Sequence, residues 1–138
     1  AEHPVILAGH SAVRAGAGKA LTDFATRLKI PVVNTMMAKG IIPYDNPYSM
    51  WTIGIPQKDY QNVILEKADL IITVGYDIVE FAPIKWNLKD DHKIIHIDSR
   101  PSAISDPLWV RRIFWYLMLE PIRCGYPDII TAMSQIPV

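Results

Sequence analysis

The chain has little cysteine, no net charge and no long apolar run, and each shortage excludes a class of protein. Cys124 is the single cysteine among 138 residues, which excludes an internal disulfide and any multi-cysteine metal site. Fourteen basic residues balance fourteen acidic ones, so the chain lacks the charge excess that binds nucleic acid or an anionic membrane surface. No apolar run approaches the ~20 residues that span a bilayer.

The composition is instead that of a protein with a packed core. Hydrophobic residues make up 50% of the chain and charged residues 20%, which argues against disorder. The length suits a single domain, so we expect one domain over residues 1–138. The first residues, Ala1 to Pro4, lack the charged-then-apolar order of a signal peptide. The single cysteine fits an intracellular setting, and we expect a cytoplasmic protein.

Short apolar runs alternate with segments of helical periodicity. Strands are expected over Pro4–Ala8, Ile30–Asn34, Asp69–Val74, Lys93–Ile97 and Ile113–Leu119, and helices over residues 19–28, 60–68 and 128–136. The helix over 60–68 is expected to present an apolar face made of Tyr60, Val63, Ile64 and Ala68. Residues 35–58 hold several glycines and prolines and are expected to be mostly loop.

Strands that are apolar throughout and alternate with helices indicate an α/β fold. Such strands are buried on both faces, as in parallel sheets. Because parallel crossovers are right-handed, the pattern predicts a Rossmann-like, doubly wound arrangement. We expect a mostly parallel sheet of about five or six strands with helices on both faces.

Three expected strands end in distinctive residues, and ligands of such sheets bind at the carboxyl ends of the strands. Gly9 and His10 follow the first strand, Gly75 and Tyr76 follow another, and Asp98 ends a third. Glycine lets backbone approach a phosphate, and an acid at a strand end can hold a ribose hydroxyl. The alternative is that both glycines serve only sharp turns.

The familiar nucleotide motifs are incomplete. A dinucleotide fingerprint starting at Gly9 would need glycines where Ser11 and Arg14 stand. A phosphate loop ending at Lys19 would need glycine at Val13 and a hydroxyl at Ala20. The four histidines form no helical pair, so we expect no metal site, and no nucleophile stands in a catalytic setting. We therefore expect no catalytic residue.

The residues from Ala68 to Asp98 carry a family resemblance. The run ADLIITVGYDIVEFAPIKWN, followed by KIIHID, resembles the central domain of thiamine-diphosphate-dependent enzymes of the acetolactate synthase type. The opening HPVILAGHSAVRAG and the segment LKIPVVNTMMAKGIIPYDNPYSMWTIG are similar to the same domain, and the resemblance covers residues 1–104.

The resemblance implies a subunit whose two flanking domains bind thiamine diphosphate and magnesium, so no cofactor is expected in this chain. It implies an enzyme of branched-chain amino acid or acetoin metabolism, and partners that include the flanking domains and further copies of the chain. Gly9, Gly75, Tyr76 and Asp98 match positions that line the family's nucleotide crevice, and His10 lies beside them. FAD is not expected there, because residues 76–79 replace an arginine-rich stretch that supports flavin in relatives.

Two features depart from the family pattern. Ser11 stands where relatives commonly have glycine, and residues 105–138 form an atypical tail. The hypothesis is a structural and interface domain of an enzyme that condenses two pyruvates to 2-acetolactate, inactive by itself. The alternatives are a nucleotide- or FAD-binding module of a related enzyme and a free-standing partner-binding domain. The apolar run within the tail predicts self-association.

Overall fold

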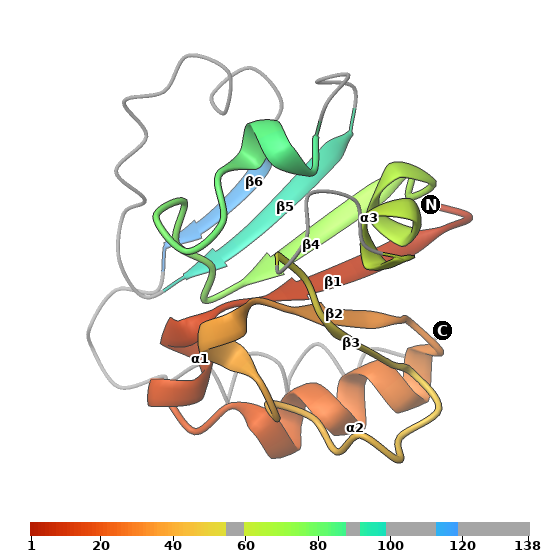
Figure 1. Cartoon of the computed structure of the whole chain (residues 1–138), viewed down its shortest axis with the longest axis vertical. Helices are drawn as coiled ribbons and strands as arrows, with labels where there is room; N and C mark the ends of the chain where they lie inside the picture. The colour runs from red at the N-terminus through yellow and green to blue at the C-terminus, as the bar shows by residue number, and fades with distance from the viewer. Residues whose placement is uncertain (55–59, 88–91, 99–112, 119–138) are drawn as a thin grey trace.

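The protein is built on a six-stranded parallel sheet, seen in a computed structural model that describes residues 1–54, 60–87, 92–98 and 113–118 (Figure 1). The strand order is β3-β2-β1-β4-β5-β6. All neighbouring strands run parallel. The strands are β1 (Pro4–Ala8), β2 (Val32–Asn34), β3 (Ser49–Thr52), β4 (Leu70–Val74), β5 (Lys93–Asp98) and β6 (Ile113–Met118).

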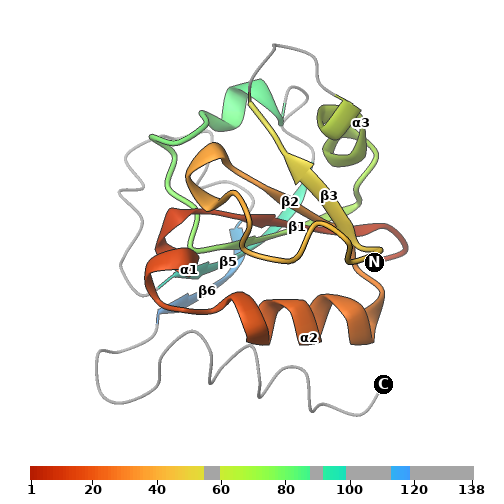
Figure 2. The same ribbon diagram turned by 60° about the horizontal axis from the view of Figure 1, so that its bottom comes forward.

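Helices lie on both faces of this sheet. They are α1 (His10–Arg14), α2 (Gly18–Leu28) and α3 (Tyr60–Glu66), with the 3₁₀ turns η1 (Met36–Ala38) and η2 (Pro83–Lys85). Figure 2 shows α2 and α3 on opposite sides of the strands. The expected Rossmann-like, doubly wound fold is confirmed, because this strand order is that of dinucleotide-binding sheets. None of the described helices is long and apolar enough to cross a bilayer.

The alternation of side chains along β1 explains why both faces need cover. Ile6 and Ala8 lie in the core beneath α2, whereas Val5 and Leu7 lie in the core beneath α3. All four are at most 3% exposed, so β1 has no solvent-facing side. Burying aliphatic side chains on two faces stabilises the fold by roughly 1.5–3 kcal/mol for each large side chain.

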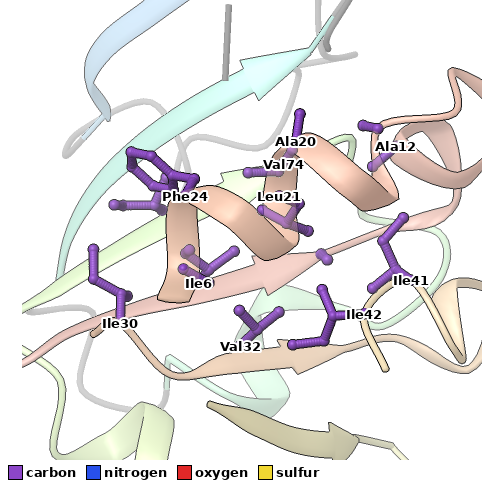
Figure 3. Packing of buried hydrophobic residues seen from close by; sticks show 14 of the residues in the cluster. Ile6, Ala12, Ala20, Leu21, Phe24, Ile30, Val32, Ile41, Ile42 and Val74 are labelled. Carbon is purple, nitrogen blue, oxygen red and sulfur yellow. The ribbon is translucent and has the colours of Figure 1, made fainter. Parts of the chain in front are cut away.

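The core on the α2 side follows directly from the periodicity of that helix. Leu21, Phe24 and Ala25 face the sheet, while Lys19 and Asp23 form an exposed ion pair one turn apart. Figure 3 shows Leu21, Phe24, Ile6 and Val32 in the cluster of buried side chains that α2 forms with the central strands. Lys29 then ends the helix in the left-handed conformation with φ of 57°.

Two expectations about elements are corrected by the structure. Residues 35–54, the described part of the segment expected to be mostly loop, contain η1 and β3, an edge strand between Tyr48 and Ile53. The expected apolar face of α3 is correct for Ile64 and Ala68, which pack in the core, and wrong for Tyr60 and Val63. Tyr60 is 91% exposed and Val63 45% exposed, whereas Asn62 and Leu65 are buried. The helix expected over 128–136 lies outside the described residues.

Candidate functional site

The candidate site is the carboxyl edge of the sheet between β1 and β4, where the strand order reverses. The chain leaves β1 at Gly9 and β4 at Gly75, so the two glycines meet at this switch point. The amide of Gly9 donates to Val74 (2.9 Å), and the amide of Ser11 donates to Gly75 (3.0 Å). The two turns are therefore joined backbone to backbone.

Both glycines are required by this close approach. A Cβ on Gly75 would lie 2.2 Å from the backbone nitrogen of Ala12, and Gly75 has φ of +59°. A Cβ on Gly9 would lie 2.5 Å from both the carbonyl oxygen of Gly75 and the Cα of Tyr76. Real Cβ atoms do not approach backbone so closely. The need for glycine at both positions is thus explained by packing within the chain.

The carboxylate of Glu80 occupies the space above Gly9. It accepts a hydrogen bond from the backbone N–H of His10 at 3.0 and 3.1 Å to its two oxygens. It also accepts from the hydroxyl of Thr35 (2.5 Å) and from the backbone N–H of Asp77 (3.2 Å). One partly buried carboxylate therefore links the segments that follow β1, β2 and β4.

A short turn positions Glu80 for these contacts. The amide of Val79 donates to the Asp77 side chain (3.0 Å), and the amide of Glu80 donates to the Asp77 carbonyl (3.0 Å). Such an Asx turn folds the chain back on itself within four residues. The turn begins one residue after Tyr76, so it directs Glu80 over the carboxyl end of β1.

A second set of polar contacts extends the site toward β3. The side-chain amide of Asn34 donates to the hydroxyl of Thr52 (2.9 Å) and to the carbonyl of Thr35 (2.9 Å). Asn34 and Thr35 are 3% and 1% exposed. Buried polar groups need such partners, so this pair holds Thr35 in place beside Glu80.

The side chain of Tyr76 points into the core rather than toward solvent. Its hydroxyl donates to the carbonyl of Phe81 and accepts a hydrogen bond from the indole N–H of Trp86 (3.1 Å). The rings of Tyr76 and Trp86 meet edge to face, with centroids 6.0 Å apart. Burial is the largest cause of the raised pKa of Tyr76. This side chain anchors the loop after β4, so only its backbone lies at the switch point.

Asp98 ends β5, the strand beyond β4, and its side chain is buried. His96, two residues earlier, is 2% exposed and its Nδ1 lies 2.6 Å from the hydroxyl of Thr73. Burial lowers the pKa of His96, and the nearby charge of Asp98 opposes that effect. No three histidine, cysteine, aspartate or glutamate side chains group as metal ligands in the part of the chain that the structure describes.

A cavity of about 400 Å³ lies at the opposite edge of the sheet. Its lining comes from the amino ends of β1 and β2 and from the ends of α2 and α3: Glu2, His3, Pro4, Val5, Lys29, Pro31, Ile64, Lys67 and Ala68. None of the expected site residues contributes to it. Ligands of open parallel sheets bind at the carboxyl edge, so we do not assign a function to this cavity.

The structure thus brings Gly9, His10, Gly75 and the backbone of Tyr76 together, with Asp98 one strand away. Sequence reasoning missed Glu80 and Thr35. An acid five residues after a strand-end glycine carries no motif, because its role depends on a turn and on a neighbour 45 residues away. Nucleotide binding by the five expected residues stays a prediction.

Comparisons with known proteins agree on one family. Residues 1–111 match the family model described as thiamine pyrophosphate enzyme, central domain. The chain is 34% identical over 99 residues to an acetolactate synthase of Bacillus subtilis (strain 168), covering 71% of this chain and 17% of that protein. It is 36% identical over 111 residues to a probable acetolactate synthase large subunit of Methanocaldococcus jannaschii, covering 75% and 18%.

One solved structure agrees with the fold. The X-ray structure of a Mycobacterium smegmatis protein described as a thiamin diphosphate-dependent enzyme superposes with a TM-score of 0.66 and 20% sequence identity. The match covers 96% of this chain and 24% of that one. The chain therefore spans less than a fifth of the two acetolactate synthases and about a quarter of the solved structure.

Proposed function

Because the chain belongs to the family of thiamine pyrophosphate enzyme central domains, we propose that it is the central structural and interface domain of an acetolactate synthase-like enzyme. That enzyme would condense two pyruvates to 2-acetolactate with loss of carbon dioxide. The identity of 34–36% to two acetolactate synthases is the observation that carries this proposal.

Thiamine diphosphate does not fit the switch point. Its diphosphate is anionic and is held through a divalent cation or through N–H and O–H donors. At the switch point, the donors of His10, Thr35 and Asp77 are already bonded to the carboxylate of Glu80, whose charge would repel a phosphate. The proposal therefore assigns thiamine diphosphate and magnesium to flanking domains and no catalytic residue to this chain.

Exposed apolar side chains at the carboxyl edge support the interface role. Five of them follow the ends of β1, β2 and β4: Val13, Met36, Met37, Val79 and Ile84, which are 40–88% exposed. Hydrogen bonds to Glu80 from Thr35 and from His10 hold these segments next to one another. Exposed apolar side chains on neighbouring segments favour contact with a partner surface. We assign that contact to a flanking domain, and we expect the enzyme to be a homo-oligomer.

The test is to clone the complete reading frame that contains this chain and to assay its product. We expect coding sequence on both sides, and acetolactate formation from pyruvate that requires added thiamine diphosphate and magnesium. The 138-residue chain alone should give no acetolactate above a blank under the same conditions. Turnover by the chain alone would contradict the assignment of catalysis to flanking domains.

Two alternatives give different outcomes. A reading frame that encodes only this chain would favour a free-standing partner-binding domain. A nucleotide-binding module would bind FAD, FMN, ADP or CoA in calorimetry. We expect no dissociation constant below about 1 μM, which corresponds to about −8 kcal/mol. Tighter FAD binding would favour the flavin alternative.

A further inference from the structure

We infer that Glu80 is an internal substitute for the phosphate group of a nucleotide, and that it closes the switch point to such ligands. The inference deepens the proposed function, since it names the residue that would keep this central domain free of a nucleotide. It starts from the bonding of the carboxylate. Three donors from three segments converge on it: the amides of His10 and Asp77 and the hydroxyl of Thr35.

These donors are not simply the free amides at the start of α1. The next two amides of α1 are already used, because Ser11 donates to the carbonyl of Gly75 and Ala12 donates to the carbonyl of Gly9. The remaining donors come from separate parts of the chain and point at one acceptor. N–H groups from successive turns together with a hydroxyl are the donors that bind phosphate oxygens in proteins.

The carboxylate of Glu80 also lies where dinucleotide-binding sheets hold the pyrophosphate of their ligand. A Cβ on Gly9 would lie 2.9 Å from Oε1 of Glu80, so the carboxylate lies against backbone that only glycine leaves open. In dinucleotide-binding sheets, a glycine at the first turn lets pyrophosphate approach the backbone at the switch point. Here the chain fills that space with its own anion, and a second anion would meet its charge.

Removing the side chain of Glu80 should leave the fold intact. The carboxylate belongs to neither hydrophobic core, and its turn is exposed, with Val79 88% exposed. Loss of the carboxylate would leave the three donors directed at one vacant position.

The experiment compares phosphate binding by the 138-residue chain with that of Glu80→Ala. Calorimetry uses inorganic phosphate, ADP and adenosine, which separates the phosphate group from the nucleoside. We expect Glu80→Ala to bind phosphate and ADP with dissociation constants at least ~10-fold lower than the unaltered chain, and adenosine with no change. Identical binding by the two proteins, including no binding by either, would overturn the inference.

Glu66→Ala is the matched control. It removes one exposed carboxylate from α3, outside the switch point, so its phosphate affinity should stay that of the unaltered chain. A gain equal to that of Glu80→Ala would mean that a lower negative charge of the chain, and not removal of the anion at the switch point, permits phosphate binding. That result would also overturn the inference.

Amide signals give a second measurement that does not depend on Glu80→Ala being stable. In Glu80→Ser, which removes the carboxylate and leaves a short polar side chain, phosphate should shift the NMR signals of the His10 and Asp77 amides. The unaltered chain should show no such shift. An unchanged pair of signals in Glu80→Ser would count against the inference. None of these outcomes bears on acetolactate formation, which tests the proposed function separately.

Discussion

Gly75 meets two demands that only glycine can meet together. Its φ of +59° is left-handed, and an added Cβ would meet the backbone nitrogen of Ala12 at 2.2 Å. Gly16 makes only the first demand, because its φ is +68° with no atom within 4 Å of a built Cβ. Comparing substitutions at Gly16 and Gly75 therefore separates the cost of backbone strain from the cost of a steric clash.

We expect Gly16→Ala to lower the free energy of unfolding by ~1–2 kcal/mol, the cost of the left-handed conformation. Gly75→Ala should cost more than ~4 kcal/mol or prevent folding, since backbone atoms have to move. Denaturant unfolding followed by circular dichroism measures both. Equal costs would mean that the turn after β4 can move away from α1.

His96 gives the protein a defined dependence on pH. Burial lowers its pKa in the folded chain below the ordinary 6.5, so the unfolded chain binds the proton more tightly. Stability from this residue is present above pH 6.5 and is lost as the pH falls through the folded pKa. The charge of Asp98 reduces the effect because it favours the protonated ring.

The expected outcome is a loss of unfolding free energy between pH 7.5 and 5 that is smaller in His96→Asn. The asparagine amide keeps a polar partner for the hydroxyl of Thr73 and does not titrate. Urea denaturation at several pH values makes the comparison. Parallel curves for the two proteins would assign the pH dependence to other groups.

At the scale of elements, α3 shows how burial decides which face of a helix matters. Leu65 is fully buried beneath the helix, whereas Val63 is 45% exposed two residues earlier. Truncating a buried leucine removes its transfer free energy and leaves a cavity. Leu65→Ala should therefore cost ~2–5 kcal/mol of unfolding free energy.

Val63→Ala is the control on the same helix and should change stability by no more than ~0.5 kcal/mol. Chemical denaturation of the two variants under one set of conditions tests the phase of the helix. A larger loss of unfolding free energy from Val63→Ala than from Leu65→Ala would mean that Val63 lies on the buried face, as the sequence predicts.

At the scale of the whole molecule, β6 is a terminal strand of the sheet. It pairs with β5 on one edge, and no described strand pairs with its other edge. Its sequence, IFWYLM, is apolar throughout. Unpaired apolar edges recruit further chains, and a symmetric dimer is the commonest result. The self-association expected from the tail therefore stays a proposal that the topology supports.

Sedimentation velocity over a range of concentrations tests it. We expect the 138-residue chain to associate, and Trp115→Lys to shift the equilibrium toward monomer by about tenfold or more, since a charge on an edge strand opposes pairing. Thr22→Lys on α2 is a control that places the charge away from the edge. Monomeric behaviour of all three proteins would contradict the proposal.

The sequence by itself determined the class of fold and the family. Continuous apolar runs mark strands buried on two faces, and the spacing of Leu21, Phe24 and Ala25 marks a helix, because both patterns are local. Those signals predicted five of the six strands and the region of two of the three described helices. The same locality explains the failures: β3 is four residues long between turns, and the face of α3 depends on what covers it.

Only the tertiary structure decided how the candidate site is built. Gly9 and Gly75 were recognisable from their places after apolar runs, but their packing against one another depends on β1 lying beside β4. Glu80 carried no signal, since its partners lie 70 and 45 residues away along the chain. Bringing such donors to one carboxylate requires the sheet to be assembled, because hydrogen bonds act over about 3 Å and sequence patterns describe only neighbours.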